Sequence, residues 1–296
     1  MKNYRVCCMV VAALLSCLPS GHGWAADSNA GGAGKKLRLA LAGAEQVPAA
    51  SQSSVPVTTP EDLCGRVVRT YPEWFEWVPA TQEHDVTATI KRKGETTSLI
   101  EQWRIQLELQ GDLKKTLGKG DDRVFPGLPA IEPWLARELQ RLHTIVNLAS
   151  VSDDRIKVKL SLEGQAKDLY VKGDSFRYKF EAPVDGFLNL ISVDPSGKIR
   201  RLFPTSLQRE SDEDNRVSAS TPLLIPRKPY SYRVSEPPYG QEFVKAIFST
   251  TPLDLSFLDK AGTRGLDGVS GAITRDVSSG ESKMGTSQVH FNTTEK

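Results

Sequence analysis

The sequence predicts a mainly β protein, α+β overall, in which an antiparallel β-sandwich follows a smaller β-rich segment and one amphipathic helix. Short runs in which apolar and polar residues alternate recur between turn residues, as half-buried strands require. The pattern changes once to the 3.6-residue period of a helix. The expected parts of the chain are residues 1–25, 26–60, 61–150, 151–258 and 259–296.

Residues 1–25 have the layout of a secretory signal peptide. Two basic residues precede an apolar run, residues 6–15, that is too short to span a bilayer as a mature helix. Small residues then precede the expected cleavage between Ala25 and Ala26. We therefore expect export to the periplasm or the cell exterior, in a bacterium of the Gram-negative type.

A second processing route competes with this cleavage. Leu14–Cys17 resembles the lipobox of bacterial lipoproteins, in which the cysteine becomes the lipidated first residue. The leucine directly before the serine departs from that pattern, so we favour cleavage after Ala25 and keep lipidation of Cys17 as the alternative. A lipid would hold the protein at a membrane surface, whereas no later stretch is apolar enough to form a transmembrane span.

The charge and the cysteine content of the chain limit the classes of function that it can have. The chain has 38 basic and 36 acidic residues, and loss of Lys2 and Arg5 with the signal peptide leaves 36 of each. A neutral chain lacks the basic footprint of nucleic acid binding, so no nucleic acid partner is expected. Only Cys64 lies beyond the signal region, and its apolar neighbours favour a buried, unreactive thiol over one that pairs with another chain.

Residues 26–60 predict a flexible tether. They are rich in Gly, Ala, Ser, Pro and Thr, and apart from an apolar patch at 37–41 they lack the large apolar residues that would offset chain entropy. We expect this segment to give the ordered part of the protein reach from its N-terminus.

The β-rich segment, residues 61–150, contains a predicted hairpin. Residues 85–90 and 97–109 alternate between apolar and polar, and Lys93-Gly94 lies between them as a turn. Aromatic residues precede the hairpin and offer either a ligand platform or core positions, of which we favour the core. These aromatic residues are Trp74, Phe75 and Trp77.

The same segment ends in the predicted amphipathic helix, residues 133–149. Its apolar stripe includes Leu135, Leu139 and Leu142, and Pro133 occupies the first turn, where proline is tolerated. His143 borders the stripe, a position that favours a packing role over that of a base or a metal ligand.

Residues 151–258 predict the β-sandwich. Alternating runs at 156–162, 176–180 and 230–234 are separated by turn residues. Residues 187–193 are apolar on both faces, which is typical of a central strand. The remaining 259–296 predict a mostly flexible tail with a last strand around Val289 and Phe291.

The stretch NLISVDPSGKIRRLFP, residues 189–204, looks most like a functional site. Asp194 can accept a backbone hydrogen bond, Pro195 presets φ and Gly197 supplies a positive φ, which together predict a type I turn with a glycine bulge closing a hairpin. The turn accounts for these three residues and leaves an exposed basic edge as the candidate partner-binding site. The residues of this edge are Lys198, Arg200 and Arg201.

No catalytic or metal-ligating pattern accompanies these elements. The histidines beyond the signal, His84, His143 and His290, are far apart, and no zinc or EF-hand spacing is present. The acidic run 210–215 lacks the glycine and the distal glutamate of a calcium loop, so we interpret it as solvated. No Gly-x-Ser-x-Gly elbow occurs. The sequence therefore predicts no catalytic residue, no metal and no cofactor.

An ordered set of short motifs in the second block resembles a known family. The set consists of Gly173–Arg177, Asp185–Leu190, Val193–Ile199, Leu202–Pro204, Ile225-Pro226 and Pro237–Ala246. Over Leu169–Leu253 it resembles domain of unknown function 4384. The helix at 133–149 is similar to the segment that precedes this domain next to caspase-like or kinase-like enzymes, but the chain carries neither module. The resemblance implies an all-β accessory domain of bacterial, often extracytoplasmic, proteins with no catalytic residues to carry over.

The leading interpretation is a non-catalytic exported envelope protein that binds or scaffolds a protein or glycan partner through its β-rich domains. Two alternatives stay open. A hydrolase of envelope polymer would use carboxylates that converge only in the fold, and predicts a pocket with two carboxyl groups, at least one with a raised pKa. A lipoprotein subunit of a secretion or transport complex would carry the lipid at Cys17.

Overall fold

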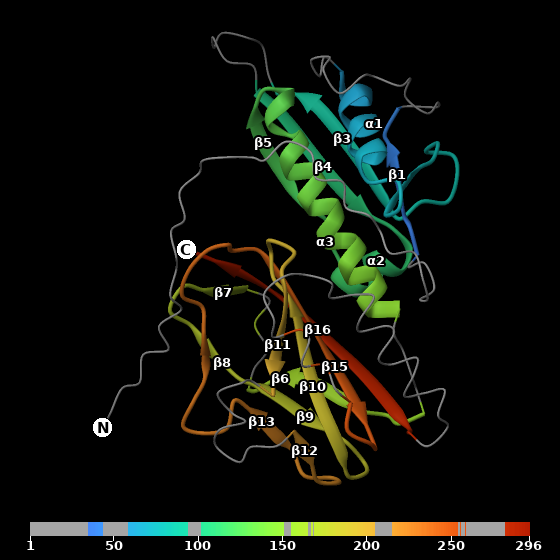
Figure 1. Ribbon diagram of the computed structural model, residues 1–296. Coiled ribbons are helices and arrows are strands. Elements are labelled where there is room, and N and C mark those ends of the chain that lie inside the picture. Colours follow the sequence, from blue (N-terminus) through green and yellow to red (C-terminus); the bar gives the residue numbers. More distant parts are fainter. Residues whose placement is uncertain are drawn as a thin grey trace, which may run out of the picture. The chain divides into compact units, whose positions relative to one another are not determined.

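The computed structural model describes residues 35–43, 59–93, 102–150, 155–164, 167, 169–204, 215–253, 255, 258 and 282–296. They belong to one compact unit, Gly32–Lys296, and more of them lie in strands than in helices (Figure 1). The expected signal peptide, with Cys17, Ala25 and Ala26, lies outside the described residues, as does nearly all of the acidic run at 210–215. No helix in the described part of the chain is long and apolar enough to cross a membrane.

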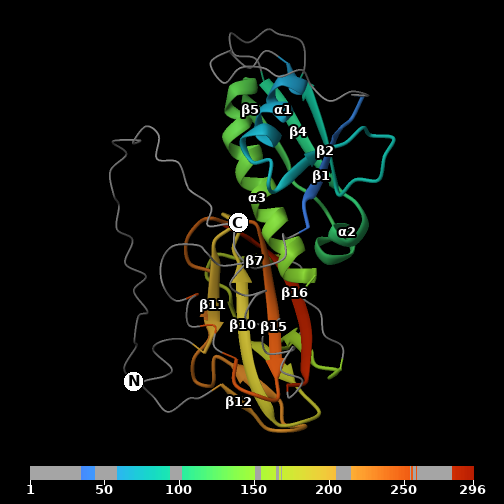
Figure 2. The same cartoon turned by 45° about the vertical axis from the view of Figure 1, so that its right-hand side comes forward.

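The first half of the described chain forms a five-stranded mixed sheet with helices on one face. Its strand order is β2-β1-β3-β4-β5, with β1 parallel to β2 and β3, and β3, β4 and β5 antiparallel. Helices α1 and α3 lie against the same face of this sheet (Figures 1 and 2). The strands are β1 Leu37–Leu41, β2 Phe75–Trp77, β3 Val86–Arg92, β4 Gln102–Leu109 and β5 Asp122–Pro126. The helices are α1 Pro60–Thr70, α2 Gly111–Leu117, the short η1 Leu128–Ala130 and α3 Glu132–Ser150.

The prediction of a tether at 26–60 is wrong at residues 37–41, which form strand β1 between β2 and β3. Leu37 and Leu39 are fully buried. The patch is too short to bury itself, but two strands that come later in the sequence cover it from both sides, and this burial offsets the entropy of ordering the chain. Residues 26–34 and 44–58 of the expected tether lie outside the described residues.

The second half forms the predicted β-sandwich. A larger sheet has the order β11-β10-β15-β16-β7, with β12 also paired to β10, and faces a three-stranded sheet of order β13-β9-β6. The side chains between the sheets include Phe180, Leu190, Phe203 and Phe248, all buried. All strand pairs of the sandwich are antiparallel except β7 with β16. The strands of the larger sheet are β7 Leu169–Val171, β10 Gly186–Val193, β11 Ile199–Phe203, β12 Arg216–Val217, β15 Gln241–Ser249 and β16 Met284–Thr294.

The remaining strands complete the smaller sheets. They are β6 Lys159–Leu162, β8 Ser175–Phe176, β9 Tyr178–Glu181, β13 Leu223–Ile225 and β14 Tyr232–Arg233, with β8 and β14 paired to each other.

Two predictions are confirmed in the larger sheet. Residues 187–193 belong to a central strand, and the expected last strand around Val289 and Phe291 is β16, which lies between β15 and β7. Residues 259–281 of the expected tail lie outside the described residues.

Helix α3 is shared by the two halves. It corresponds to the helix predicted at 133–149 and contacts β1 of the first sheet as well as β10 and β15 of the sandwich. One continuous cluster of buried side chains contains Leu139 and Leu142 of α3 together with Ile191 of β10 and Phe243 and Ile247 of β15. The sandwich therefore buries one face of its larger sheet internally and covers part of the other face with α3.

Candidate functional site

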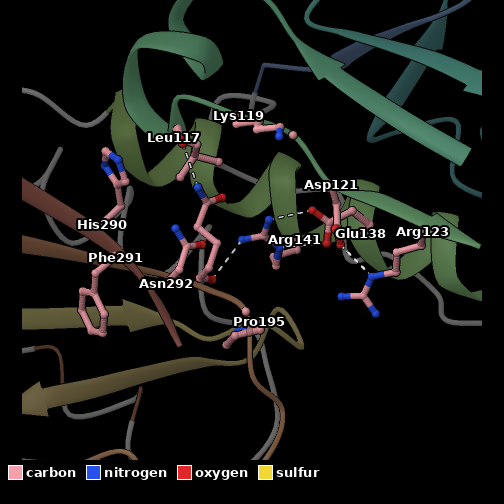
Figure 3. Close-up of a pocket in the computed structure, with 13 residues that line it drawn as sticks. Leu117, Lys119, Asp121, Arg123, Glu138, Arg141, Pro195, His290, Phe291 and Asn292 are labelled. Carbon is pink, nitrogen blue, oxygen red and sulfur yellow. Dashed lines mark hydrogen bonds and ion pairs between the residues drawn. The ribbon is translucent and has the colours of Figure 1, made fainter. Parts of the chain in front are cut away.

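A cleft of about 310 Å³ lies at the junction of the two halves (Figure 3). One wall is made by residues 117–123, which connect α2 to β5, and by α3. The other wall is made by Pro195 of the β10–β11 turn, by Gly240-Gln241 at the start of β15 and by residues 290–292 of β16. The cleft therefore draws its lining from five separate parts of the chain.

The segment that follows α2 in this wall requires glycine at two positions. Gly118 ends α2 with a φ of +75°, a conformation that favours glycine, and its N–H donates to the Lys114 carbonyl. At Gly120 the backbone approaches β4 so closely that a Cβ would lie 2.0 Å from the Leu107 carbonyl oxygen. Lys119, between them, is exposed at the rim of the cleft.

The floor of the cleft is a buried ion pair on α3. Arg141 donates from Nε to Oε2 of Glu138 at 2.9 Å and from Nη2 to Oε1 at 2.6 Å. The two side chains are 6% and 8% exposed, respectively. Burial acts to lower the pKa of Arg141, but the Glu138 carboxylate beside it reverses this effect, so the pKa is raised above its ordinary value. Arg141 is therefore held as a cation in a fixed orientation.

Two further contacts connect the walls. Nη1 of Arg141 donates to the Gln241 carbonyl at 3.4 Å, and Nε2 of Gln241 donates to the Leu117 carbonyl at 2.8 Å (Figure 3). At the rim, Nε of Arg123 donates to Oδ2 of Asp121 at 2.9 Å. Both acids that line the cleft are thus bound to arginines, an arrangement that suits recognition of a polar group better than proton transfer.

The turn predicted at 194–197 is confirmed and lies beside the cleft. Oδ1 of Asp194 accepts hydrogen bonds from the N–H groups of Ser196 at 2.9 Å and Lys198 at 3.0 Å, and Gly197, with a φ of +85°, donates to the Asp194 carbonyl at 2.8 Å. A Cβ built on Gly197 would lie 3.4 Å from Cβ of Arg141. The turn is therefore packed against α3, and of its residues Pro195 lines the cleft.

The prediction of an exposed basic edge is wrong for Arg201, which is 8% exposed. Successive residues of a strand point to opposite faces, so Arg200 and Arg201 of β11 cannot both face outward. Arg200 is exposed, and its Nη2 lies 3.2 Å from Oδ2 of Asp194. Lys198 is also exposed. None of the three lines the cleft, and a partner-binding role for this edge remains a prediction.

The structure also brings two carboxyl groups near each other, as the hydrolase alternative requires. Burial, and secondarily the charge of Asp194, raise the pKa of Glu242 to about 7, while Arg200 and Arg141 oppose the shift. However, Asp194 uses its carboxylate oxygens for the turn and for Arg200. Neither carboxyl group lines the cleft. We therefore assign Asp194 to the turn rather than to catalysis.

The aromatic residues considered in the sequence, and His143, do not line the cleft. Phe75 and Trp77 are buried core residues, as predicted, whereas Trp74 is 36% exposed and stacks on Tyr71 and His143, with ring centroids 5.3 Å and 5.9 Å apart. His143 is buried and packs as expected. In the part of the chain that the structure describes, no group of three or more His, Cys, Asp or Glu is placed to hold a metal ion.

Cys64 of α1 is buried and unbonded, as the sequence predicts for an unreactive thiol. Burial raises its pKa far above the ordinary value, so the thiolate form is suppressed.

The cleft itself was not predicted from the sequence. The one available signal was the Glu138–Arg141 pair three residues apart on α3, next to its apolar stripe, where a charged pair has to be mutually satisfied.

Comparison with known proteins finds one family model that matches part of the chain. No curated protein matches the chain. A family model matches residues 169–252, from the start of β7 to just beyond the end of β15, and leaves out β6, β16 and α3. This model is described as Domain of unknown function (DUF4384), so residues 169–252 are similar to that family.

Proposed function

We propose that this protein is a non-catalytic component of the bacterial envelope, exported to the periplasm or the cell exterior, that binds or scaffolds a protein or glycan partner. The signal-like N-terminus and the resemblance at the sequence level support the location. The cleft is the observation that carries the binding role, because it is a recess between two β-rich halves whose acids are both bound to arginines.

The geometry favours binding over hydrolysis. A hydrolase that uses two carboxyl groups needs one oxygen to attack or to activate water and another to donate a proton. Glu138 is bound in bidentate fashion by Arg141, and Asp121 is bound by Arg123, so each would have to break an ion pair before it could act. A ligand, in contrast, can use the cleft as it stands.

Site-specific cross-linking tests the binding role. We would place a photoreactive amino acid at His290, an exposed residue of the cleft rim, and at Lys115, an exposed residue of α2, as the control. In cells of the source bacterium, His290 is expected to give a discrete adduct that Lys115 does not give. Absence of a His290 adduct, together with measurable turnover of an envelope polymer by the purified protein, would refute the proposal.

Mass spectrometry of the mature protein tests the route of export. A free N-terminus at Ala26 supports cleavage of an ordinary signal peptide, and a diacylated Cys17 supports the lipoprotein alternative. Retention of the intact N-terminus in the cytoplasm would contradict both.

A further inference from the structure

We infer that the cleft takes a neutral, hydroxyl-rich group, a sugar unit of an envelope glycan. This inference rests on the proposed binding function and narrows its partner class. It depends on three properties of the lining residues: how their charges are compensated, which hydrogen-bonding groups remain, and how large the recess is.

The charges of the cleft select neither an anion nor a cation. Three cations, Lys119, Arg123 and Arg141, line it together with the acids Asp121 and Glu138. Glu242, just outside the lining, also interacts electrostatically with Arg141. An anion placed against Arg141 would lie close to the Glu138 carboxylate, and a cation placed against Glu138 would lie close to the guanidinium. A neutral ligand avoids both repulsions.

The lining residues retain both donors and acceptors. Arg141 uses three of the five guanidinium N–H groups for Glu138 and the Gln241 carbonyl. The Gln241 side chain donates through Nε2, and its Oε1 accepts no hydrogen bond within the described residues. The exposed His290 ring likewise makes none within that part of the chain. Each ring hydroxyl of a sugar donates one hydrogen bond and accepts others, so it matches such a mixed set, whereas a phosphate or carboxylate only accepts.

The size and the apolar part of the lining fit one sugar ring. The cleft has a volume of about 310 Å³, which is large enough to hold one hexose. It lies at the lower end of the range for small-molecule sites. Pro195, which is half-buried, provides apolar surface among the polar groups, as a C–H face of a pyranose requires, whereas the neighbouring Leu117 and Phe291 are almost fully buried.

Titration calorimetry with defined oligomers tests this inference. The probes are chitotetraose, which is neutral, a hyaluronan tetrasaccharide, which carries carboxylates, and tetra-alanine, a peptide. We expect chitotetraose to bind with an affinity that is insensitive to salt, and His290→Ala and Arg141→Lys to weaken it at least tenfold. Gln288→Ala, an exposed change on the same strand two residues from His290 and outside the lining, is expected to leave it unchanged.

His290→Ala keeps the test decisive if Arg141→Lys fails to fold, because His290 is exposed. Binding of tetra-alanine but not of chitotetraose, with the same sensitivity to His290→Ala, would overturn the inference and leave the binding function intact. Stronger binding of the hyaluronan probe, with an affinity that falls as salt rises, would also overturn it. If no probe binds and the cross-linking position at His290 gives no adduct in cells, both proposals fall.

Discussion

The two large sheets of this protein meet solvent in different ways. In the five-stranded sheet, β4 alternates strictly from Arg104 to Leu109, with buried residues toward the helices and exposed residues on the other face. In the sandwich, β15 is buried at every position from Phe243 to Ser249. The first sheet has one covered face and the second has two, because α3 covers β10 and β15 on the side away from the sandwich core.

The difference shows that the matched family segment is smaller than the folding unit. Residues 169–252 include β10 and β15 but neither α3, which covers them, nor β16, which lies between β15 and β7. Without α3 the side chains of Ile191, Phe243 and Ile247 would lose their cover. The segment that matches the DUF4384 model therefore depends on sequence both before and after it.

The largest expected effect comes from removing a side chain under α3. Phe243→Ala empties a fully buried position between β15 and the helix, and we expect a loss of about 3–5 kcal/mol in the free energy of unfolding. Gln106→Ala, on the open face of β4, is the matched change in the other sheet and should stay within about 0.5 kcal/mol. Equilibrium unfolding in urea measures both. Similar losses for the two variants would mean that α3 does not cover the sandwich.

The β10–β11 turn is the next contact to break. Asp194→Ala removes an acceptor for two backbone N–H groups and the partner of Arg200, so we expect a loss of about 2–3 kcal/mol. Arg200→Ala, an exposed change in the same ion pair, should cost much less. Arg201→Ala should cost more than Arg200→Ala because Arg201 is buried. Thermal unfolding of the three variants gives the ranking, and an equal effect of all three would contradict the assigned turn.

Local patterns in the sequence predicted the elements that are specified by residues close to one another in the chain. An unbroken apolar run indicates β10, and the helical period of apolar residues indicates α3. The residue types of the Asp194–Gly197 segment indicate the turn. Strand β1 was missed because its burial depends on β2 and β3, which lie more than 30 residues later. The start of α1 did have a local signal, since Thr59 accepts the N–H of Asp62 and Pro60 follows.

The site was less predictable than the fold for the same reason. Its lining comes from residues near 120, 140, 195, 240 and 290, and only tertiary contacts bring them together. The prediction of an exposed basic edge was wrong at Arg201 for a different reason. Once β11 was identified, its period of two already implied that Arg200 and Arg201 point to opposite faces. That step required no tertiary information.

Glu242 gives the sandwich a pH dependence near neutral pH. Its pKa is about 7 in the folded protein and near 4.5 in the unfolded chain, so the folded state holds a proton that the unfolded state has already released. The contribution of Glu242 to the free energy of unfolding is fully present below pH 4.5, and it is lost as the pH rises through about 7. We expect Glu242→Gln to match the unchanged protein at pH 4.5 and to be more stable by about 3 kcal/mol at pH 8. Urea midpoints at pH 4.5, 6, 7 and 8 measure this, and parallel pH curves would contradict it.

The smallest effect is expected on the open face of the first sheet. Arg104 of β4 forms an ion pair with Asp122 of β5, as Arg141 does with Glu138, and the Arg104 side chain holds the pKa of Asp122 below its ordinary value. The Arg104 side chain is 57% exposed, however, so water replaces the lost partner and Asp122 is not stranded in the interior. We therefore expect Arg104→Ala to leave the urea midpoint unchanged, whereas Arg141→Ala strands a buried carboxylate and destabilises the protein strongly. A midpoint shift for Arg104→Ala comparable to that of Arg141→Ala would show that the outer face of this sheet is covered in solution, and the contrast between the two sheets would then disappear.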